Sequence, residues 1–193
     1  MDLLPLGAAS AHVFPTLRAR LTEREAVDVF TGGAARHVIG LIRRDQLRSI
    51  APVYVPYHLF RVEISDRGQQ QTVFLAIDAV IGSLDLYHFA PDRAELDLVD
   101  VHSRNRIAAA VTAEDAWPRV ADQLRRVLFQ TGFFRLRDPR IAGGREPIDL
   151  HIPYWVGFYE TAGRVRLGVI DAVRRRIEGA KARGLFEEWL RDA

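Results

Sequence analysis

Two stretches of the chain, near residues 55–80 and near 152–173, carry the pattern of antiparallel hairpins: an apolar strand, a turn and a second apolar strand. In the first stretch one face of the expected strand carries His58, Phe60, Val62 and Ile64, and the other carries Tyr57 and Leu59. A strand that is apolar on both faces belongs in a sheet covered on both sides, or at an interface between two copies of the unit.

The two hairpins share one order of residues. The segment 55–63 (VPYHLFRVE) matches 152–160 (IPYWVGFYE), and Ile-Asp-Ala-Val occurs at 77–80 and again at 170–173. Upstream of each hairpin lies a helix start, LTEREA at 21–26 and VTAEDA at 111–116, with threonine as the N-cap and acids in the first turn. Three matches in the same order predict an internal duplication.

The predicted fold class is therefore α+β, with two tandem pseudo-symmetric helix-plus-antiparallel-hairpin units packed as one globular protein. We expect an N-terminal extension over 1–20, a first helix/hairpin repeat over 21–110 and a second repeat over 111–193 that ends in a C-terminal helix. The first helix is expected from about Glu23 to Leu47, interrupted at Gly32-Gly33, since glycine costs roughly 1 kcal/mol in a helix interior. The other expected elements are helices over 113–130 and 172–191, strands over 83–89 and 95–101, and a loop over 138–149.

Composition narrows the class of protein. The 193 residues are 48% hydrophobic and 27% charged, as in ordinary globular proteins. The sequence has no cysteine, which excludes disulfides, thiolate zinc sites and cysteine nucleophiles. No apolar run approaches the roughly 20 residues of a membrane-spanning helix, and the first residues lack the cationic segment of a secretory signal. We expect a soluble, cytoplasmic protein without membrane insertion.

The helix start and the strand that ends in Ile-Asp-Ala carry a resemblance to a known family. Glu25, Ala26, Ile77, Asp78, Ala79 and Gly82 make the first copy resemble PepSY-type modules, small α+β units whose second hairpin strand ends in Val/Ile-Asp-Ala-x-x-Gly. In the second copy Asp115, Ala116, Ile170, Asp171 and Ala172 match, and Arg175 occupies the glycine position. The resemblance implies the α+β fold and an association with the inhibition or regulation of peptidases; family members are usually exported.

Four aligned acids are candidate functional residues: Asp78, Asp171, Glu63 and Glu160. An ionised carboxylate between apolar residues must be hydrogen-bonded or paired. The structural interpretation of Asp78 and Asp171 is a turn acid that accepts backbone N–H bonds. The functional alternative is a symmetric acid pair that faces a small-molecule-binding or catalytic cavity between the repeats. Glu63 and Glu160 are expected to pair with arginines such as Arg61 or those of the other copy.

Aromatic and histidine positions indicate packing or an interface rather than chemistry. Tyr57, His58, Tyr154, Trp155 and Trp189 are candidate core or interface residues, and His58 aligns with Trp155. The histidines lack the spacing of a metal site, and the chain shows neither a nucleophile elbow nor a glycine-rich phosphate loop. We therefore predict no metal and no cofactor; the alternative is a small metal site on the acidic hairpin, where His88 and His102 lie near Asp85 and Asp100.

Arginines make up the densest basic cluster of the chain, and they are Arg164, Arg166, Arg174, Arg175 and Arg176. A run of this kind is usually a solvated face. The alternative is an anion-binding surface for nucleic acid or an acidic partner, whose binding would weaken with salt.

Taken together, these patterns favour a non-catalytic binding, adaptor or assembly protein over an enzyme, with a protein partner or self-association. The cavity that uses Asp78 and Asp171 and nucleic-acid binding through the C-terminal arginines remain the alternatives.

Overall fold

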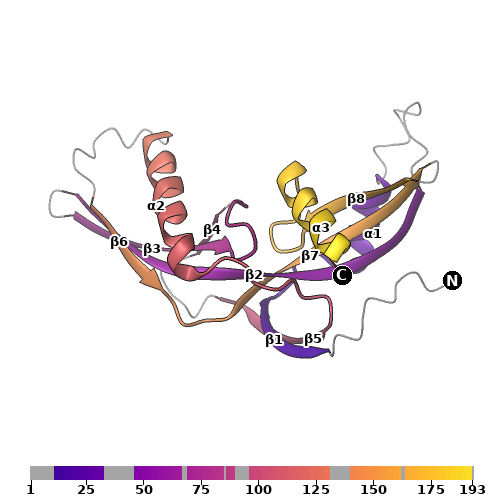
Figure 1. Cartoon of the computed structure of the whole chain (residues 1–193), viewed down its shortest axis with the longest axis horizontal. Coiled ribbons are helices and arrows are strands. Elements are labelled where there is room, and N and C mark those ends of the chain that lie inside the picture. Colours follow the sequence, from indigo (N-terminus) through magenta and orange to yellow (C-terminus); the bar gives the residue numbers. More distant parts are fainter. Residues whose placement is uncertain are drawn as a thin grey trace. The chain divides into compact units, whose positions relative to one another are not determined.

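The computed structural model describes residues 11–32, 46–66, 69–84, 86–89, 96–130, 140–161 and 164–192. Its elements in chain order are β1 (His12–Leu17), α1 (Glu23–Thr31), β2 (Gln46–Asp66), β3 (Gln69–Asp78), β4 (Tyr87–Phe89), β5 (Leu98–Ser103), α2 (Ala113–Gln130), β6 (Arg140–Arg145), β7 (Leu150–Thr161), β8 (Arg164–Asp171), β9 (Arg176–Ile177) and α3 (Ala180–Asp192) (Figure 1). Helices and mostly antiparallel strands confirm the α+β class.

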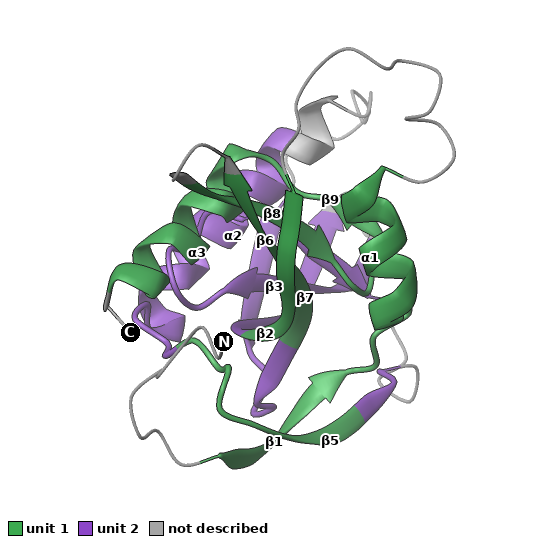
Figure 2. Cartoon of the chain, turned by 90° about the vertical axis from the view of Figure 1, so that its right-hand side faces the viewer, with its two compact units in different colours: residues 1–54, 99–107, 152–193 green, residues 55–98, 108–151 purple. Residues whose placement is uncertain are grey.

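Seven strands hydrogen-bond in the order β4-β3-β2-β7-β8-β9, with β6 also paired to β2, while β1 and β5 form a separate two-stranded sheet. The chain divides into two compact units (Figure 2). Unit 1 consists of residues 1–54, 99–107 and 152–193, and unit 2 of residues 55–98 and 108–151. The long strand β2 contributes its first residues to unit 1 and those from Val55 onward to unit 2. Each unit therefore combines segments from both predicted repeats.

In unit 2, helix α2 covers one face of the β2–β3 hairpin. The buried side chains at this contact are Phe60, Val62, Ile64, Leu75, Ile77, Ala113, Ala116, Val120 and Leu124. They come from alternate positions of the strands and from one stripe of the helix, as periods of 2 and 3.6 residues require. Thr112 precedes the helix and caps it, because its hydroxyl accepts the N–H of Asp115. Amphipathic patterning thus explains why α2 forms and which face it buries.

In unit 1, helix α1 covers one face of the β7–β8 hairpin. A capping box opens the helix, because the Thr22 hydroxyl accepts the Glu25 N–H and the Glu25 carboxylate accepts the Thr22 N–H. The helix buries Ala26 and Phe30 against Ile170 and Ala172. On the opposite face of the hairpin α3 packs, with the ring of Phe186 5.5 Å from that of Tyr154.

The two units differ in whether the helix or the hairpin supplies the large side chains at their contact. In unit 1 the Phe30 ring lies over Gly157 and Gly168, where an added Cβ would approach the ring to 3.1 and 3.0 Å. Counted from the shared Tyr and Asp positions, Gly157 corresponds to Phe60 and Gly168 to Leu75. Counted from the threonine caps of the two helices, Phe30 corresponds to Val120. At these aligned positions unit 2 has large strand residues under a valine, and unit 1 has glycines under a phenylalanine.

Matching hydrogen bonds join each helix start to its hairpin. The carbonyl of Ala79 accepts the N–H groups of residues 110 and 111, and the carbonyl of Ala172 accepts those of residues 20 and 21. A ring nitrogen of His58 lies 2.7 Å from the carbonyl of Val111, while the Trp155 indole donates to the carbonyl of Leu21 at 2.8 Å. The helix of each predicted repeat thus contacts the hairpin of the other repeat.

Several predicted elements are wrong in extent. The first helix does not reach Leu47, because Gly32 adopts φ 91° and its N–H bonds back to Asp28 and Val29, which ends α1 at Thr31. Residues 33–45 lie outside the described part, and Leu47 lies in β2. The C-terminal helix does not start at residue 172 but at Ala180, because residues 171–177 form a turn and β9.

Three further predictions need correction. The expected loop over 138–149 contains β6, which pairs with β2. The strand expected over 83–89 is limited to Tyr87–Phe89, since the N–H groups of Ser83 and Leu84 bond to Asp78 instead. The strand expected over 95–101 forms later, as β5, in the sheet with β1. None of the described helices is long and apolar enough to cross a membrane.

Candidate binding surface

Asp78 is fully buried, and its carboxylate is surrounded by backbone donors. Oδ1 accepts the N–H groups of Val80, Ile81 and Gly82 at 3.2, 2.7 and 2.9 Å. Oδ2 accepts those of residues 83 and 84 at 2.9 and 2.8 Å. These five donors exceed the roughly four lone-pair sites of a carboxylate. This geometry favours the turn-capping interpretation and leaves no oxygen of Asp78 directed at a ligand.

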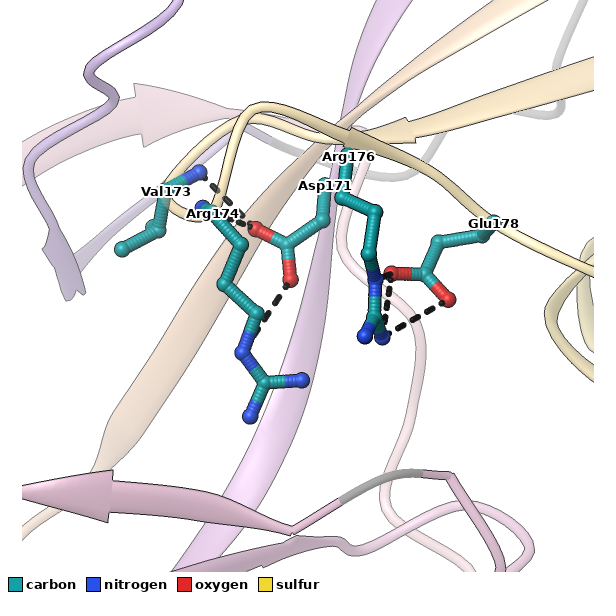
Figure 3. Close-up of polar contacts among 5 residues, drawn as sticks. All are labelled: Asp171, Val173, Arg174, Arg176 and Glu178. Carbon is teal, nitrogen blue, oxygen red and sulfur yellow. Dashed lines mark hydrogen bonds and ion pairs between the residues drawn. The ribbon is translucent and has the colours of Figure 1, made fainter.

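Asp171, also fully buried, holds the equivalent turn of unit 1 (Figure 3). Its Oδ1 accepts the N–H groups of Val173 and Arg174 at 2.9 and 2.7 Å, and the Arg174 Nε lies 4.0 Å from Oδ2. The charged Arg174 side chain at the edge of the turn thus supplements the backbone donors.

Glu63 and Glu160 form exposed ion pairs. Glu63 lies 3.1 Å from Arg61 of the same strand, and Glu160 of β7 lies 3.0 Å from Arg48 of β2. Exposed pairs of this kind contribute about 0–1 kcal/mol. Among the described residues, no group of three or more histidine, aspartate or glutamate side chains could hold a metal ion.

The aromatic candidates lie in or against the cores of the units. Tyr57 is buried edge-to-face against Tyr87, and Tyr154 is buried against Phe186. His58 and Trp155 are half-buried and bond to the carbonyls that precede the two threonine caps. Trp189 is half-buried on α3. These side chains pack within their own units, so a contact surface must be sought elsewhere.

Most of the arginine candidates with described side chains have carboxylate partners in unit 1. Arg175 lies 2.8 Å from Glu25, and Arg176 lies 3.1 Å from Glu178 (Figure 3). Arg174 lies next to Asp171, and Arg166 is exposed on β8. The Arg164 side chain lies outside the described ones. Partnered guanidinium groups do not favour an anion-binding cluster at 174–176.

Arg175 also adopts φ 57°, a left-handed conformation that its counterpart Gly82 adopts with φ 61°. For a residue with a side chain this region is costly. The guanidinium of Arg175 reaches back to Glu25 on α1, whereas in unit 2 the guanidinium of Arg119 on α2 donates to the carbonyl of Ile81. In both units an arginine therefore ties the turn to the helix.

Two side chains have a displaced pKa. Hydrogen bonds from the backbone N–H and hydroxyl of Thr22, followed by that from Arg175, lower the pKa of Glu25. Burial raises the pKa of the Tyr54 hydroxyl. Glu25 caps a helix and Tyr54 packs against Phe14, so both shifts report structural roles.

An apolar patch on the β7–β8 hairpin is the feature that sequence reasoning missed. It consists of Phe158, Leu167 and Val165, on the hairpin face that α3 covers at Tyr154. Val165 is 70% exposed, and Phe158 and Leu167 are half-buried. Val156 and Val169, the next pair along the same face, are fully buried. We call Phe158, Leu167 and Val165 the β8 patch.

The outer edge of β8 is open beside this patch. The N–H of Glu178 donates to the carbonyl of Val169, so the backbone groups of Val169 point away from β7. Because strand groups alternate sides, those of Leu167 and Val165 point the same way. In the described part of the chain no strand other than β7 pairs with β8 before Ile170. Four backbone groups therefore line an edge next to exposed apolar side chains.

Unit 2 provides an internal comparison for the β8 patch. The positions that correspond to Phe158, Val165 and Leu167 are Arg61, Thr72 and Phe74. Arg61 is exposed and charged, Thr72 is polar, and Phe74 is buried. Strand β4 pairs with Phe74 through Phe89. The same edge is thus covered or polar in unit 2 and apolar in unit 1.

Comparison with known proteins adds no relative: no family model, curated protein or solved structure matches this chain.

Proposed function

We propose that the chain is a non-catalytic protein-binding module that accepts an extended segment of a partner chain as an added strand along β8. The observation that carries the proposal is the β8 patch beside an open strand edge. Strand addition takes its affinity from main-chain hydrogen bonds and its specificity from alternate side chains. An exposed edge strand is ready to pair in this way.

The partner is a different polypeptide rather than a second copy paired through the same edge. Antiparallel pairing of two β8 strands centred on this patch would bring Arg166, or Arg164 and Arg166, against the same residues of the copy. Like charges directly opposite each other destabilise a strand pair. A foreign segment has no such restriction.

We also infer that the two halves derive from one repeated helix-and-hairpin unit, each helix packing on the other copy's hairpin. Support comes from the Tyr57–Asp78 and Tyr154–Asp171 register pairs and from the matched carbonyl acceptors at Ala79 and Ala172. Co-expressed fragments 1–110 and 111–193 should then assemble into a stable heterodimer. Fragments that each fold as separate monomers would contradict this inference.

The resemblance to PepSY-type modules fits the same proposal. Regulation of a peptidase requires contact with a polypeptide, and an edge that accepts an extended segment would provide that contact. The Asp78 turn, closed at Gly82, gives the resemblance a structural basis in unit 2.

A neutral probe peptide tests strand addition. We would titrate the blocked heptapeptide Ser-Thr-Val-Thr-Val-Thr-Ser into the ¹⁵N-labelled protein and follow the backbone amide signals. The expected result is saturable shifts at Val165 and Leu167. Proline at residue 165 removes a donor that points outward and no donor that faces β7, so Val165→Pro should abolish the shifts while the fold persists.

Two controls make the outcome decisive. Val165→Thr keeps the N–H and should retain binding more weakly, and Val13→Thr changes another strongly exposed valine, 67% exposed on β1, and should bind as wild type. Absence of shifts up to the solubility limit, or equal shifts in Val165→Pro, would overturn the proposal.

A further inference from the structure

We infer that the segment bound along β8 carries an aromatic residue opposite Leu167 and an apolar residue two positions later, opposite Val165. This inference rests on the proposed function and adds the chemistry of the partner. The observation that carries it is the cover of the equivalent edge in unit 2, which strand β4 of the same chain provides.

Strand β4 shows how an edge of this kind is covered. It pairs antiparallel with β3, and its Phe89 lies opposite Phe74. The ring of Phe89 stacks with that of Tyr87, two positions earlier, at a centroid distance of 5.9 Å. Tyr87 in turn lies edge-to-face on Tyr57 at 5.6 Å. Beneath these rings Phe74 is 7% exposed, so alternate aromatic residues of an added strand bury the outer side chain of the hairpin.

Unit 1 fills the first of these two aromatic positions from a helix. Tyr154 is the counterpart of Tyr57. It packs edge-to-face against Phe186 of α3, with the ring centroids 5.5 Å apart. Phe186 thus takes in unit 1 the role that Tyr87 has in unit 2.

The second aromatic position, that of Phe89, is unfilled among the described residues of unit 1. Leu167 is the counterpart of Phe74, and among the described strands β7 alone pairs with it. Leu167 is half-buried, whereas Phe74 is buried. Leucine is also smaller than phenylalanine, so a ring opposite Leu167 has at least as much room as Phe89 has. A large aromatic side chain there would cover apolar area that is now exposed.

The direction and register of the bound segment follow from β9. Strand β9 is antiparallel to β8, and the N–H of Glu178 bonds to the carbonyl of Val169. A segment that continues this pairing begins opposite Leu167 and runs toward Val165. Its residues opposite these two exchange hydrogen bonds with their outward groups, and their side chains lie on the face of the β8 patch. The first of them takes the place that Phe89 has in unit 2.

The two positions differ in the surface that they offer. The cross-strand neighbour of Leu167 on the same face is Phe158, whereas that of Val165 is Glu160, which is exposed and paired with Arg48. Apolar surface is therefore wider at Leu167 than at Val165. An aromatic ring is favoured opposite Leu167, and a smaller apolar side chain is sufficient opposite Val165.

Two peptides with one phenylalanine each test this inference. We would compare the blocked peptides Ser-Thr-Phe-Thr-Val-Thr-Ser and Ser-Thr-Val-Thr-Phe-Thr-Ser with the neutral probe peptide by the same amide titration. The first peptide places its phenylalanine opposite Leu167 and should bind about fivefold more tightly than the neutral probe peptide. The second has the same composition but places phenylalanine opposite Val165, and should bind less tightly than the first. In the first complex the ring current should also shift the Leu167 methyl signals.

A substitution on the protein provides the matched variant. Leu167→Thr keeps the backbone edge and removes apolar area, so the first peptide should lose its advantage while the neutral probe peptide still binds. Leu98→Thr changes another half-buried leucine, in β5, and should leave the preference unchanged.

The outcomes separate the two proposals. If none of the three peptides binds, the proposed function fails. If all three bind wild type equally and Val165→Pro abolishes binding, the function stands and the inference about the aromatic residue is overturned. Tighter binding of the second peptide than of the first would overturn it as well. A concentration-dependent dimer that disappears in Val165→Pro would identify a second copy as the occupant and would also overturn it.

Discussion

Replacing Phe30 by alanine removes the side chain that fills the space above Gly157 and Gly168 in unit 1. Phe30 is buried, and its ring is within contact distance of the Cβ positions of both glycines. Phenylalanine-to-alanine changes in cores cost about 3–5 kcal/mol, more where neighbours cannot move into the cavity. Two glycines offer no side chains to refill it, so we expect a cost of about 4 kcal/mol.

The informative experiment is a double-mutant cycle with Gly157→Ala. With Phe30 present, the added methyl would lie 3.1 Å from ring atoms, and overpacking of this kind costs about 1–3 kcal/mol. With alanine at residue 30 the methyl has room. Gly157→Ala should then stabilise by about 0.5–1 kcal/mol, because glycine weakens a strand interior by that amount. The predicted result is a change of sign between the two backgrounds.

Unit-specific readouts are needed for this cycle. Urea unfolding gives the global free energy, and hydrogen exchange at the amides of Leu21 and Ala172, which are hydrogen-bonded in unit 1, gives the local one. Phe30→Leu is a milder partner if Phe30→Ala does not fold. Val29→Ala, on the exposed side of α1, should change stability by less than about 0.5 kcal/mol. Equal effects of Gly157→Ala in both backgrounds would refute the packing account.

Three other predictions concern the turns and the helix cap. Asp78→Asn should destabilise unit 2 by about 2–4 kcal/mol in urea unfolding, because an amide presents donors to backbone donors. Asp171→Asn should destabilise unit 1 for the same reason, and unchanged stability in either variant would contradict the hydrogen-bond account. Arg175→Gly should be more stable than Arg175→Ala by about 1 kcal/mol in the same assay, since both lose the ion pair with Glu25 and only glycine relieves the left-handed strain; equal stabilities would argue against strain. The hydrogen bonds from Thr22 and then Arg175 lower the pKa of Glu25 below its ordinary 4.5. The contribution of Glu25 to the stability of α1 is therefore present above pH 4.5 and is lost as pH falls through the lowered pKa. Hydrogen exchange of the α1 amides at pH 5 and pH 3 should show this loss in wild type, and an equal loss in Glu25→Gln would contradict the prediction.

Local chemistry made part of the fold predictable. The Thr22–Glu25 capping box, the helix at 113–130 and both hairpins follow from periodicity and caps, and the burial of Asp78 among backbone donors follows from the cost of an unpaired buried charge. The packing of α1 on β7–β8 cannot be predicted from periodicity, because an apolar stripe such as Ala26 and Phe30 could cover either hairpin. The match in size between the large Phe30 side chain and Gly157 is the feature of the sequence that indicates this pairing.

The β8 patch shows a second limit. Val165 and Leu167 alternate with polar residues just as buried strand residues do, and only the neighbouring strands decide whether they are covered. In the aligned repeat the positions of Phe158 and Val165 are occupied by the polar residues Arg61 and Thr72, and this difference indicates that the patch is specific to the second hairpin. The sequence predicts a loop where β6 forms, because the glycines of this segment lower its strand propensity, and pairing with β2 orders it as a strand.

Hydrogen exchange of four consecutive amides in β8 measures the binding edge most directly. In the free protein the amides of Val165 and Leu167 should exchange quickly, whereas those of Arg166 and Gly168, which face β7, should be protected. Saturation with the neutral heptapeptide should slow exchange at Val165 and Leu167 at least about tenfold, as expected for amides that become hydrogen-bonded. Protection of Val165 and Leu167 in the free protein, or rapid exchange there with the peptide bound, would contradict strand addition along β8.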